Sequence, residues 1–262
     1  MGFGIKTFIK GLFPKEKPKP VEVDHSYDGN RFYCPLCETS FGKLKDNVGF
    51  YYLRGELLDH YTANANCPKC NSGIRHRFLL TFLINKHIDM ASKKILHFAP
   101  EPGIARFLLK QPGIDYMAAD IDPQGYPREF NAKKVDITAI PFSEDSFDGV
   151  VCCHVLEHIK DDRLACQELY RVIKAGGWAI VSLPIYGETT FEDASLNAEG
   201  RMKMYGIDQH MRLNGLDFRQ KLEAAGFKVM TVSIDDVPGN YVDRSATSPH
   251  INSDKYLFYC EK

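Results

Sequence analysis

The sequence of 262 residues lacks three features, and each absence excludes a class of protein. No apolar run approaches the roughly 18 residues of a membrane-spanning helix. The first 20 residues alternate lysine with apolar side chains, without the continuous apolar core and small-residue cleavage site of a secretory signal. The formal charge is only -1, which argues against binding nucleic acid through a broad basic surface. We therefore expect a cytoplasmic globular protein for which nucleic acid is disfavoured as a partner.

The eight cysteines are not scarce, and half of them occur in paired spacing. Without an export signal, such pairs favour metal binding over disulfides. The two knuckles, Cys34-Pro-Leu-Cys37 and Cys67-Pro-Lys-Cys70, supply the four thiolates that a structural Zn²⁺ takes. Two unrelated cysteine pairs are the weaker alternative. We predict a zinc-ribbon module with a linking helix over residues 21–90, in which the aromatic run Phe50–Tyr52 forms strand and core.

Residues 1–20 form a distinct segment in which apolar side chains are interleaved with Lys6 and Lys10. As a helix, the segment has a broad apolar face with basic residues opposite. Such a helix can lie in the interface of an anionic bilayer, which here is the inner face of the membrane. The equal alternative is a terminal arm, or a helix docked on the protein itself or on a partner.

The second knuckle leads into an apolar segment, Phe78 to Ile88, which we predict to be a helix packed on a sheet. Arg75 and Arg77 precede it. Two arginines beside an active-site edge can hold an anionic substrate group or a cofactor carboxylate. They can also pair with acidic residues between two modules, and we favour this structural interpretation.

A βαβ unit is the clearest pattern in the chain. An apolar strand, Phe147 to Cys153, is followed by a helix with apolar residues at helical spacing, and Gly176-Gly177 then leads to the strand Trp178 to Leu183. Two short apolar runs around one amphipathic helix indicate a parallel, buried sheet. Ligands bind beyond the carboxyl ends of such strands, where His154 and Pro184 stand.

The stretch 135–184 resembles the class I S-adenosylmethionine (SAM)-dependent methyltransferases. In one branch of that family the fourth strand ends in H-x-L-E-H, here His154 to His158, after an acid-x-x-x-x-Pro-Phe segment, here Asp136 to Phe142. The resemblance implies an α/β, Rossmann-like, doubly wound and mostly parallel seven-stranded sheet over residues 91–262, with SAM as cofactor. The other predicted elements are strands Lys94–Phe98, Tyr116–Ala119, Lys228–Ile234 and Lys255–Cys260, the last two antiparallel, and helix Asp217–Ala225.

The glycine-rich turn that the family has after its first strand is altered in this sequence, which reads HFAPEPG. Aligned on the family pattern, the cofactor-binding positions are Ala99, Glu101 and Gly103, so only the last glycine remains. Two prolines stiffen the loop and remove amide donors. Glu101 is the candidate for contacting the cofactor ammonium.

Acidic residues at two later positions match the rest of the cofactor site. An acid at a strand end binds ribose hydroxyls in dinucleotide folds, and the resemblance implies the same for Asp120, with Asp122 as a second candidate. Asp136 matches the acid near the adenine amino group, with Ile137 against the ring. The alternative for each Asp is a helix cap.

Methyl transfer to a hydroxyl needs alignment and a base, for which a histidine is suitable. We predict His210 as the catalytic base over His154, because His210 stands in the insertion Ile185–Met211, where the family places substrate contacts. That insertion has no periodic pattern and is expected to be a lid. Glu157 is expected to organise the cofactor loop, and His158 to be a packing residue.

Three functions remain open. The favoured one is O-methylation of a small-molecule or glycan hydroxyl, since the segment 205–218 resembles lids of methyltransferases associated with bacterial surface sugars. The second is RNA methylation, because some rRNA methyltransferases carry a four-cysteine module, although the neutral charge argues against it. The third is a non-catalytic binding protein with a degenerate fold, which the altered loop suggests.

Overall fold

The computed structural model describes residues 24–244 and 255–262. The predicted arm of residues 1–20 lies outside these ranges. Within them, no helix combines the length and the apolar character needed to cross a membrane.

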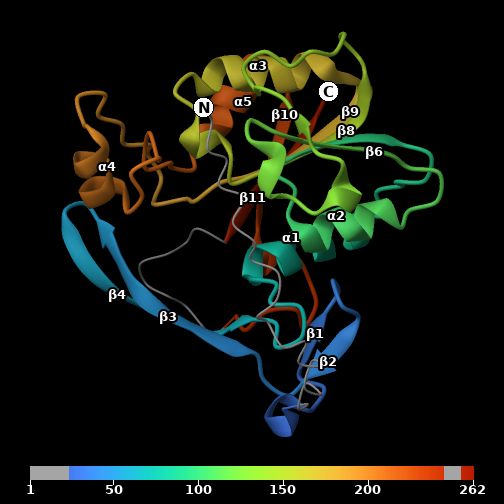
Figure 1. Ribbon diagram of the computed structural model, residues 1–262, viewed down its shortest axis with the longest axis vertical. Coiled ribbons are helices and arrows are strands. Elements are labelled where there is room, and N and C mark those ends of the chain that lie inside the picture. The colour runs from blue at the N-terminus through green and yellow to red at the C-terminus, as the bar shows by residue number, and fades with distance from the viewer. Residues whose placement is uncertain (1–23, 245–254) are drawn as a thin grey trace, which may run out of the picture.

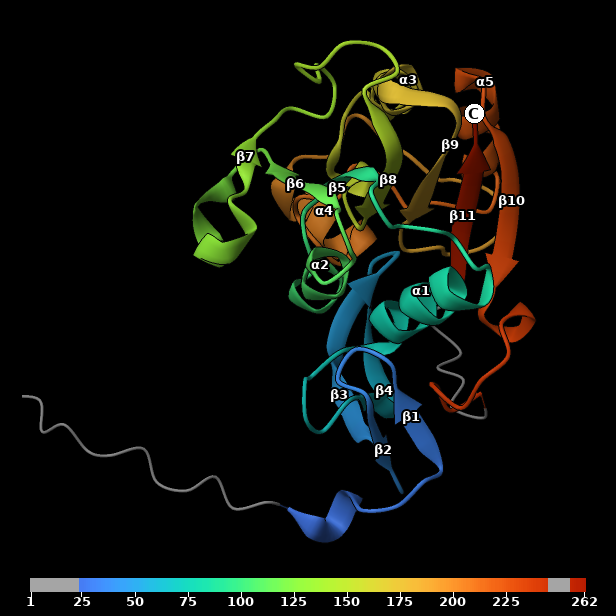
Figure 2. The ribbon, with the colours of Figure 1, turned by 90° about the vertical axis from the view of Figure 1, so that its right-hand side faces the viewer.

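The main sheet (Figure 1) has seven strands in the order β10-β11-β9-β8-β5-β6-β7, which can be followed in Figure 2. The first five along the chain pair in parallel, and β11 is antiparallel to both β9 and β10. This confirms the predicted fold class and the antiparallel final pair. The strands are β5 (Lys94–Phe98), β6 (Asp115–Asp120), β7 (Lys133–Lys134), β8 (Phe147–Cys153), β9 (Ile173–Ser182), β10 (Lys228–Ser233) and β11 (Tyr256–Glu261).

Helices cover both faces of this sheet because successive side chains of a strand point to opposite faces, and the buried strands carry apolar side chains on both. Leu96 and Phe98 point to a core shared with α3 (Asp162–Val172) and α5 (Phe218–Ala225). Ile95 points to a second core, shared with α1 (Ile74–Asn85) and α2 (Pro102–Leu109). The predicted linking helix therefore packs on the sheet, as α1, and lies between the sheet and the N-terminal strands (Figure 2).

The prediction that Gly176-Gly177 separates the helix from a strand beginning at Trp178 is wrong. Strand β9 begins at Ile173, directly after α3, and its pairing with β8 jumps from Ile173 opposite Phe147 to Trp178 opposite Gly149. Gly176, with φ +76°, lies inside the resulting bulge. A bulge adds residues to one strand only, and glycine accepts the backbone angles that this requires.

The N-terminal module consists of two small sheets. Strands β1 (Phe32–Cys34) and β2 (Thr39–Phe41) form a short hairpin with a small core. Strands β3 (Lys45–Leu53) and β4 (Glu56–Asn66) form a long hairpin that projects from it (Figure 1). The aromatic run does form strand, but its place in the core was predicted wrongly, because Phe50 is 75% exposed on this two-stranded ribbon.

The insertion predicted to be irregular contains α4 (Ala198–Tyr205). Asn197 caps this helix by accepting from the Gly200 amide, and Gly206 ends it with φ +81°. Only Tyr205 of the helix is buried, so no apolar period marks it in the sequence. Five short 3₁₀ segments complete the described elements: η1 (His25–Tyr27), η2 (Pro123–Gly125), η3 (Arg128–Phe130), η4 (Leu156–His158) and η5 (Ile234–Asp236).

Candidate functional site

A groove of about 660 Å³ lies at the carboxyl ends of β5, β6 and β8, where parallel sheets bind ligands. We call it the strand-end groove. Its lining mixes apolar and acidic side chains with four basic or amide groups. The residues are Phe98, Ala99, Asp120, Ile121, Val135, Asp136, Ile137, Thr138, His154, Val155, His158, Ile159, Lys160, Asp161 and Gln209.

The carboxylate of Asp120 is held in place at the end of β6. Its Oδ2 accepts from the Tyr126 hydroxyl at 2.7 Å, and its Oδ1 accepts from the Asp122 amide at 2.8 Å. Asp122 is outside the groove lining, and its side chain caps η2 through the Gln124 amide. The structure therefore brings Asp120 to the groove and gives Asp122 the alternative role of a cap.

Asp136 and Ile137 also line the groove. Oδ1 of Asp136 accepts from both the amide and the hydroxyl of Thr138, at 2.8 and 2.7 Å, and these bonds lower the pKa of the carboxyl. Ile137 is buried in the core of the sheet. An ionised acid and an apolar surface therefore stand side by side in this wall.

Of the altered loop after β5, one residue faces the strand-end groove and another faces away from it. Ala99 lines the groove, with φ +46° and its amide bonded to the Ala119 carbonyl at 2.9 Å. The Glu101 carboxylate instead lies 3.2 Å from His97 Nε2, 3.7 Å from His76 Nε2 and 3.8 Å from Arg75 Nε. Burial alone would raise the pKa of Glu101, but His97, His76 and Arg75 together lower it.

Gly103 also faces the N-terminal module rather than the groove. A Cβ atom there would lie 2.9 Å from Leu36 Cδ2, in the first cysteine knuckle. Neither Glu101 nor Gly103 is among the residues that line the strand-end groove. The structure thus places both at the contact between the two modules.

A second cavity of about 560 Å³ lies beside the groove, and we call it the hairpin pocket. It is lined by the β3–β4 hairpin, the start of α1, η4, the segment after β9 and the end of α4. Residues of the segment 234–244, which we call the C-terminal loop, complete the lining together with Lys255. Its polar lining includes Tyr51, His60, Arg75, Tyr186 and His210. His154 and His158 line both cavities, so the two meet at the end of β8.

His154 turns the chain at this junction. Its backbone has φ +54°, an uncommon conformation for a residue with a side chain, and its amide bonds the Ser182 carbonyl at 2.8 Å. Its Nδ1 lies 3.5 Å from Glu157 Oε1. Burial, with the nearby charge of Arg75, lowers the pKa of His154 well below the usual range for histidine.

Glu157, His158 and His210 lie together next to it. One ligand-capable atom from each is within 4.8 Å of the others. The rings of His158 and His210 meet edge to face, with centroids 4.8 Å apart. Burial raises the pKa of Glu157 to about 8 and lowers the pKa of His210 to about 4.

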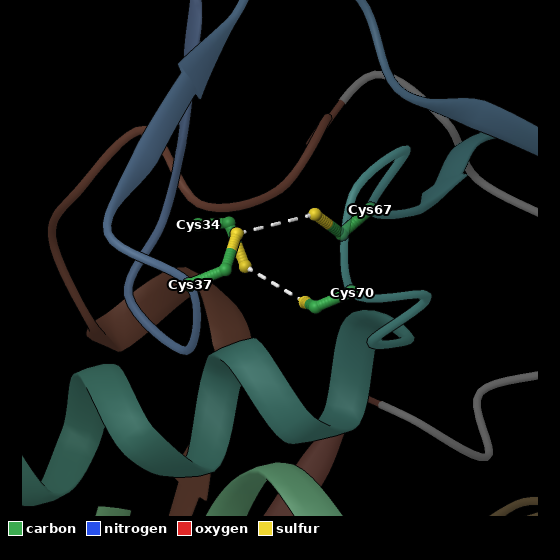
Figure 3. Close-up of side chains that lie close together, drawn as sticks. All are labelled: Cys34, Cys37, Cys67 and Cys70. Carbon is green, nitrogen blue, oxygen red and sulfur yellow. Dashed lines mark hydrogen bonds between the residues drawn. The ribbon is translucent and has the colours of Figure 1, made fainter. Parts of the chain in front are cut away.

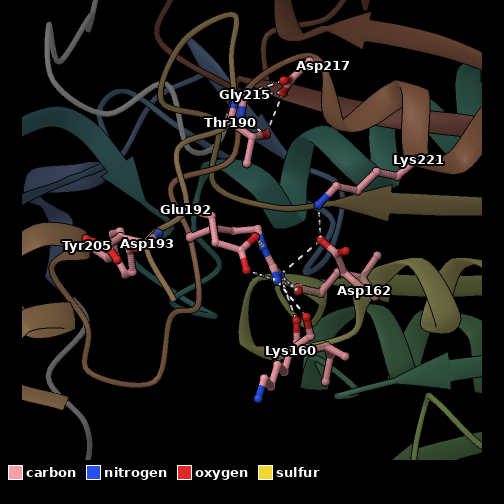
Figure 4. A network of polar contacts seen from close by, with 12 residues as sticks. Lys160, Asp162, Thr190, Glu192, Asp193, Tyr205, Gly215, Asp217 and Lys221 are labelled. Atoms are coloured by element: carbon pink, nitrogen blue, oxygen red, sulfur yellow. Dashed lines mark hydrogen bonds and ion pairs between the residues drawn. The ribbon is translucent and has the colours of Figure 1, made fainter. Parts of the chain in front are cut away.

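A buried arginine, Arg212, holds the segment after β9 against this cluster. Arg212 donates to the carbonyls of Ile159 and Lys160, at 2.8 and 3.0 Å, and pairs with Glu192 at 2.8 Å and Asp162 at 3.1 Å. Figure 4 shows Lys160, Glu192 and Asp162 converging in this network. The network joins η4 to the segment that carries His210.

The two arginines in the first turn of α1 differ in their surroundings. Arg77 is fully buried and donates to the backbone carbonyls of Ser72, Ala65 and Tyr241. It is therefore a structural link between the module and the C-terminal loop. Arg75 lines the hairpin pocket, with its Nε 3.8 Å from Glu101.

The four cysteines of the two knuckles come together at one end of α1. Figure 3 shows their side chains pointing toward one another, and their sulfurs all lie within 4.8 Å. Sγ of Cys34 is 3.6 Å from that of Cys70, and Cys37 is equally far from Cys67. Four converging thiols are the donor set that tetrahedral Zn²⁺ takes.

Several residues that line or support the two cavities were missed by the sequence analysis. Tyr126, which holds Asp120, stands in a loop without a motif, and Tyr51 and His60 were assigned to a ribbon. Glu157 and His158 were assigned supporting roles, although both face the hairpin pocket. The one available signal was the H-x-L-E-H string itself, which places three titratable side chains within five residues.

Comparison with known proteins bears on the part of the chain that carries the groove. Residues 96–181 match a family model described as "Methyltransferase domain". The chain is similar to a "Demethylmenaquinone methyltransferase" of Thermus thermophilus, with 29% identity over 106 residues, which are 36% of this chain and 48% of the relative. It is also similar to a "Probable S-adenosylmethionine-dependent methyltransferase" of Mycolicibacterium smegmatis, with 30% identity over 119 residues, 45% of this chain and 43% of the relative. The chain spans less than half the length of each of these two relatives.

The fold is shared with solved structures. A crystal structure of an S-adenosylmethionine dependent methyltransferase from Mesorhizobium loti superposes with a TM-score of 0.54 at 14% identity, covering 72% of this chain and all of that one. At this level of identity the similarity establishes the fold alone.

Proposed function

We propose, on the premise that this chain carries a class I methyltransferase domain of the SAM-dependent kind, that the protein methylates a hydroxyl of a small molecule or glycan. The observation that carries the proposal is the meeting of the strand-end groove and the hairpin pocket at His154 and His158. Methyl transfer needs a donor and an acceptor aligned at one point, and two cavities that share one wall supply that arrangement.

The residues of the strand-end groove fit the proposed cofactor. Asp120 would bind the ribose hydroxyls, and Asp136 and Ile137 would contact the adenine. Ala99 lies where the backbone passes close to the groove. When bound, SAM supplies an electrophilic methyl group on a sulfonium, so the protein mainly has to align the acceptor and exclude water.

The hairpin pocket suits an organic acceptor of moderate size. Its volume is within the usual range of small-molecule sites, and it offers hydroxyl, imidazole and guanidinium groups. His154 and His210, the predicted catalytic residues, both line it. The substrate in the name of the Thermus thermophilus relative, demethylmenaquinone, is also a small molecule.

The four-cysteine cluster is proposed to bind one structural zinc. Four protein ligands leave no coordination position open for chemistry. Its role would be to hold the knuckles against α1 and α2, where Leu36 meets Gly103.

Two measurements test the proposal together. Isothermal titration calorimetry with SAM and S-adenosylhomocysteine should show binding of both to the full chain. Incubation with SAM and a panel of glycans and metabolites, followed by mass spectrometry, should then reveal a methyl ether. Absence of binding would favour a non-catalytic protein with a degenerate fold, and methylation of RNA alone would favour the second hypothesis.

A further inference from the structure

We propose that Glu157, His158 and His210 form a binding site for a first-row divalent metal ion, separate from the four-cysteine cluster. The site would stand in the wall that the strand-end groove and the hairpin pocket share, since His158 lines both. Binding of the metal is a property of this cluster by itself. Its use on an acceptor hydroxyl rests on the function proposed above.

The donor set and its geometry suit such an ion. Two imidazoles and a carboxylate are ligands that Zn²⁺, Co²⁺, Mn²⁺ and Fe²⁺ accept. Ligand bonds of about 2.0–2.2 Å place neighbouring donor atoms about 3.4 Å apart in a tetrahedral site. The three donors already lie within 4.8 Å of one another, so small side-chain rotations bring them into range.

Each of the three residues has a ligand-capable atom that is buried without a hydrogen bond. Both oxygens of Glu157, which is 1% exposed, have no hydrogen-bond partner among the described residues, and neither has Nδ1 of His158 or of His210. The contact of Glu157 Oε1 with His154 Nδ1 is long, at 3.5 Å. Buried polar atoms left unpaired destabilise a fold. One ion bound by the three side chains would satisfy the carboxylate and both imidazoles together.

The surroundings hold the three side chains in place. The Met211 amide donates to the Glu157 carbonyl at 2.8 Å, which ties the segment of His210 to η4. His158 forms a hydrogen bond with the Gln209 backbone, in addition to its contact with the His210 ring. Such outer contacts orient metal ligands and strengthen metal binding. The Arg212 network fixes the same two segments from the other side.

Three protein ligands leave a coordination position open, and it would face the hairpin pocket, which all three residues line. A hydroxyl oxygen bound there loses its proton more easily, because the cation stabilises the oxyanion. In the transfer, the oxygen forms a bond to the methyl carbon as the carbon–sulfur bond breaks with its electron pair left on sulfur. The hydroxyl proton passes to solvent. His210 would then act as a ligand and not as the general base.

Metal binding by the full chain tests the inference. Protein loaded with zinc is dialysed until it retains one zinc per chain, and is then titrated with Co²⁺ by calorimetry, with metal content measured in parallel. Wild type should bind one equivalent beyond the zinc of the four-cysteine cluster, without the absorption that thiolate-bound cobalt shows. Glu157→Gln and His210→Ala should each weaken this equivalent by on the order of 100-fold or more. His60→Ala, which changes a histidine of the same pocket outside the cluster, should keep it.

The outcomes are separable from those for methyl transfer. No second equivalent in wild type, or a second equivalent unchanged in Glu157→Gln and His210→Ala, overturns the inference. Circular dichroism and SAM binding show whether each variant is folded, and the shape-preserving Glu157→Gln guards against a loss of packing. If the second ion binds but no methylated product forms, the metal site stands and the proposed function fails.

Discussion

Asp120 and Asp122 are two residues apart, yet their carboxylates have different surroundings. Asp120 lines the strand-end groove, and Asp122 caps η2. We expect Asp120→Ala to weaken SAM binding by roughly ten- to a hundredfold, because a charge-assisted hydrogen bond contributes about 1.5–3 kcal/mol. Calorimetry gives the dissociation constant directly.

Asp122→Ala is the matched control for that change. It removes a carboxylate two positions away and should leave SAM affinity nearly unchanged. Because Asp120→Ala also deprives the Tyr126 hydroxyl of its acceptor, Tyr126→Phe separates the two effects. If Asp122→Ala weakens binding as much as Asp120→Ala, the ribose contact is assigned to the wrong acid.

An ion pair on α3 holds the wall of the groove. Glu168 accepts from the Ile140 amide at 2.8 Å and from Arg171, and Arg171 donates to the carbonyls of Ile140 and Phe142. The helix thus clamps the loop that carries Asp136 and Ile137. The hydrogen bonds from Arg171 lower the pKa of Glu168.

This clamp should make stability depend on pH. A carboxyl with a lowered folded pKa stabilises the fold above its unfolded pKa of about 4.3, and the contribution is lost as the pH falls through the folded pKa. Glu168→Gln should therefore lower the free energy of unfolding at pH 7 by about 1–3 kcal/mol. In urea unfolding at several pH values, the difference between the two proteins should shrink toward acid. A difference that is constant with pH would assign the effect to packing.

The contact between α4 and the long hairpin closes the hairpin pocket. The amides of Arg54 and Gly55 bond the carbonyls of Met204 and Lys203, at 2.8 and 2.9 Å. A Cβ on Gly206 would lie 2.5 Å from the Tyr52 carbonyl oxygen. Gly206→Ala should therefore displace the hairpin from α4. Its cost in folding free energy should exceed the roughly 1 kcal/mol that a positive φ alone costs alanine.

Hydrogen exchange at Arg54 and Gly55 measures this opening. Their amides should exchange faster in Gly206→Ala, while SAM affinity stays close to that of wild type. Gly176→Ala is the control, since Gly176 has a similar φ of +76° and nothing within 4 Å of its Cβ position. Equal protection of the hairpin amides in the two variants would mean that α4 and the hairpin are not held by this contact.

At the scale of the whole molecule, the four-cysteine cluster brings the two knuckles of the N-terminal module together. We expect Cys34→Ser with Cys67→Ser to remove one zinc per chain and to lower the thermal midpoint, because so small a module has little core of its own. Metal analysis and a thermal melt provide the two readouts. Cys166→Ala, a change of a buried cysteine in the sheet core, should retain the zinc. Zinc content unchanged in the double variant contradicts the assignment.

Local patterns were enough to predict the parts of the fold that depend on neighbouring residues. Strands β5 and β8 begin and end where their apolar runs do, because a buried parallel strand needs apolar side chains on both faces. The C-P-x-C spacing likewise determines that each knuckle presents two thiols. Helix α4 was not predicted, since a single buried residue does not produce a periodic pattern of apolar side chains in the sequence.

The sequence by itself therefore determined strands β5 and β8 and the two cysteine knuckles, for each follows from periodicity or spacing within a short segment. The seven-stranded sheet was expected only because the stretch 135–184 resembles a family. Only the tertiary structure decided which way the side chains at the strand ends face. Glu101 stands in the loop where a cofactor contact was expected, but His97, His76 and Arg75 surround its carboxylate. His210 lies near Glu157 only because the segment that carries His210 is hydrogen-bonded to η4. Such contacts join residues far apart in the chain, and a one-dimensional pattern does not specify the distances between them.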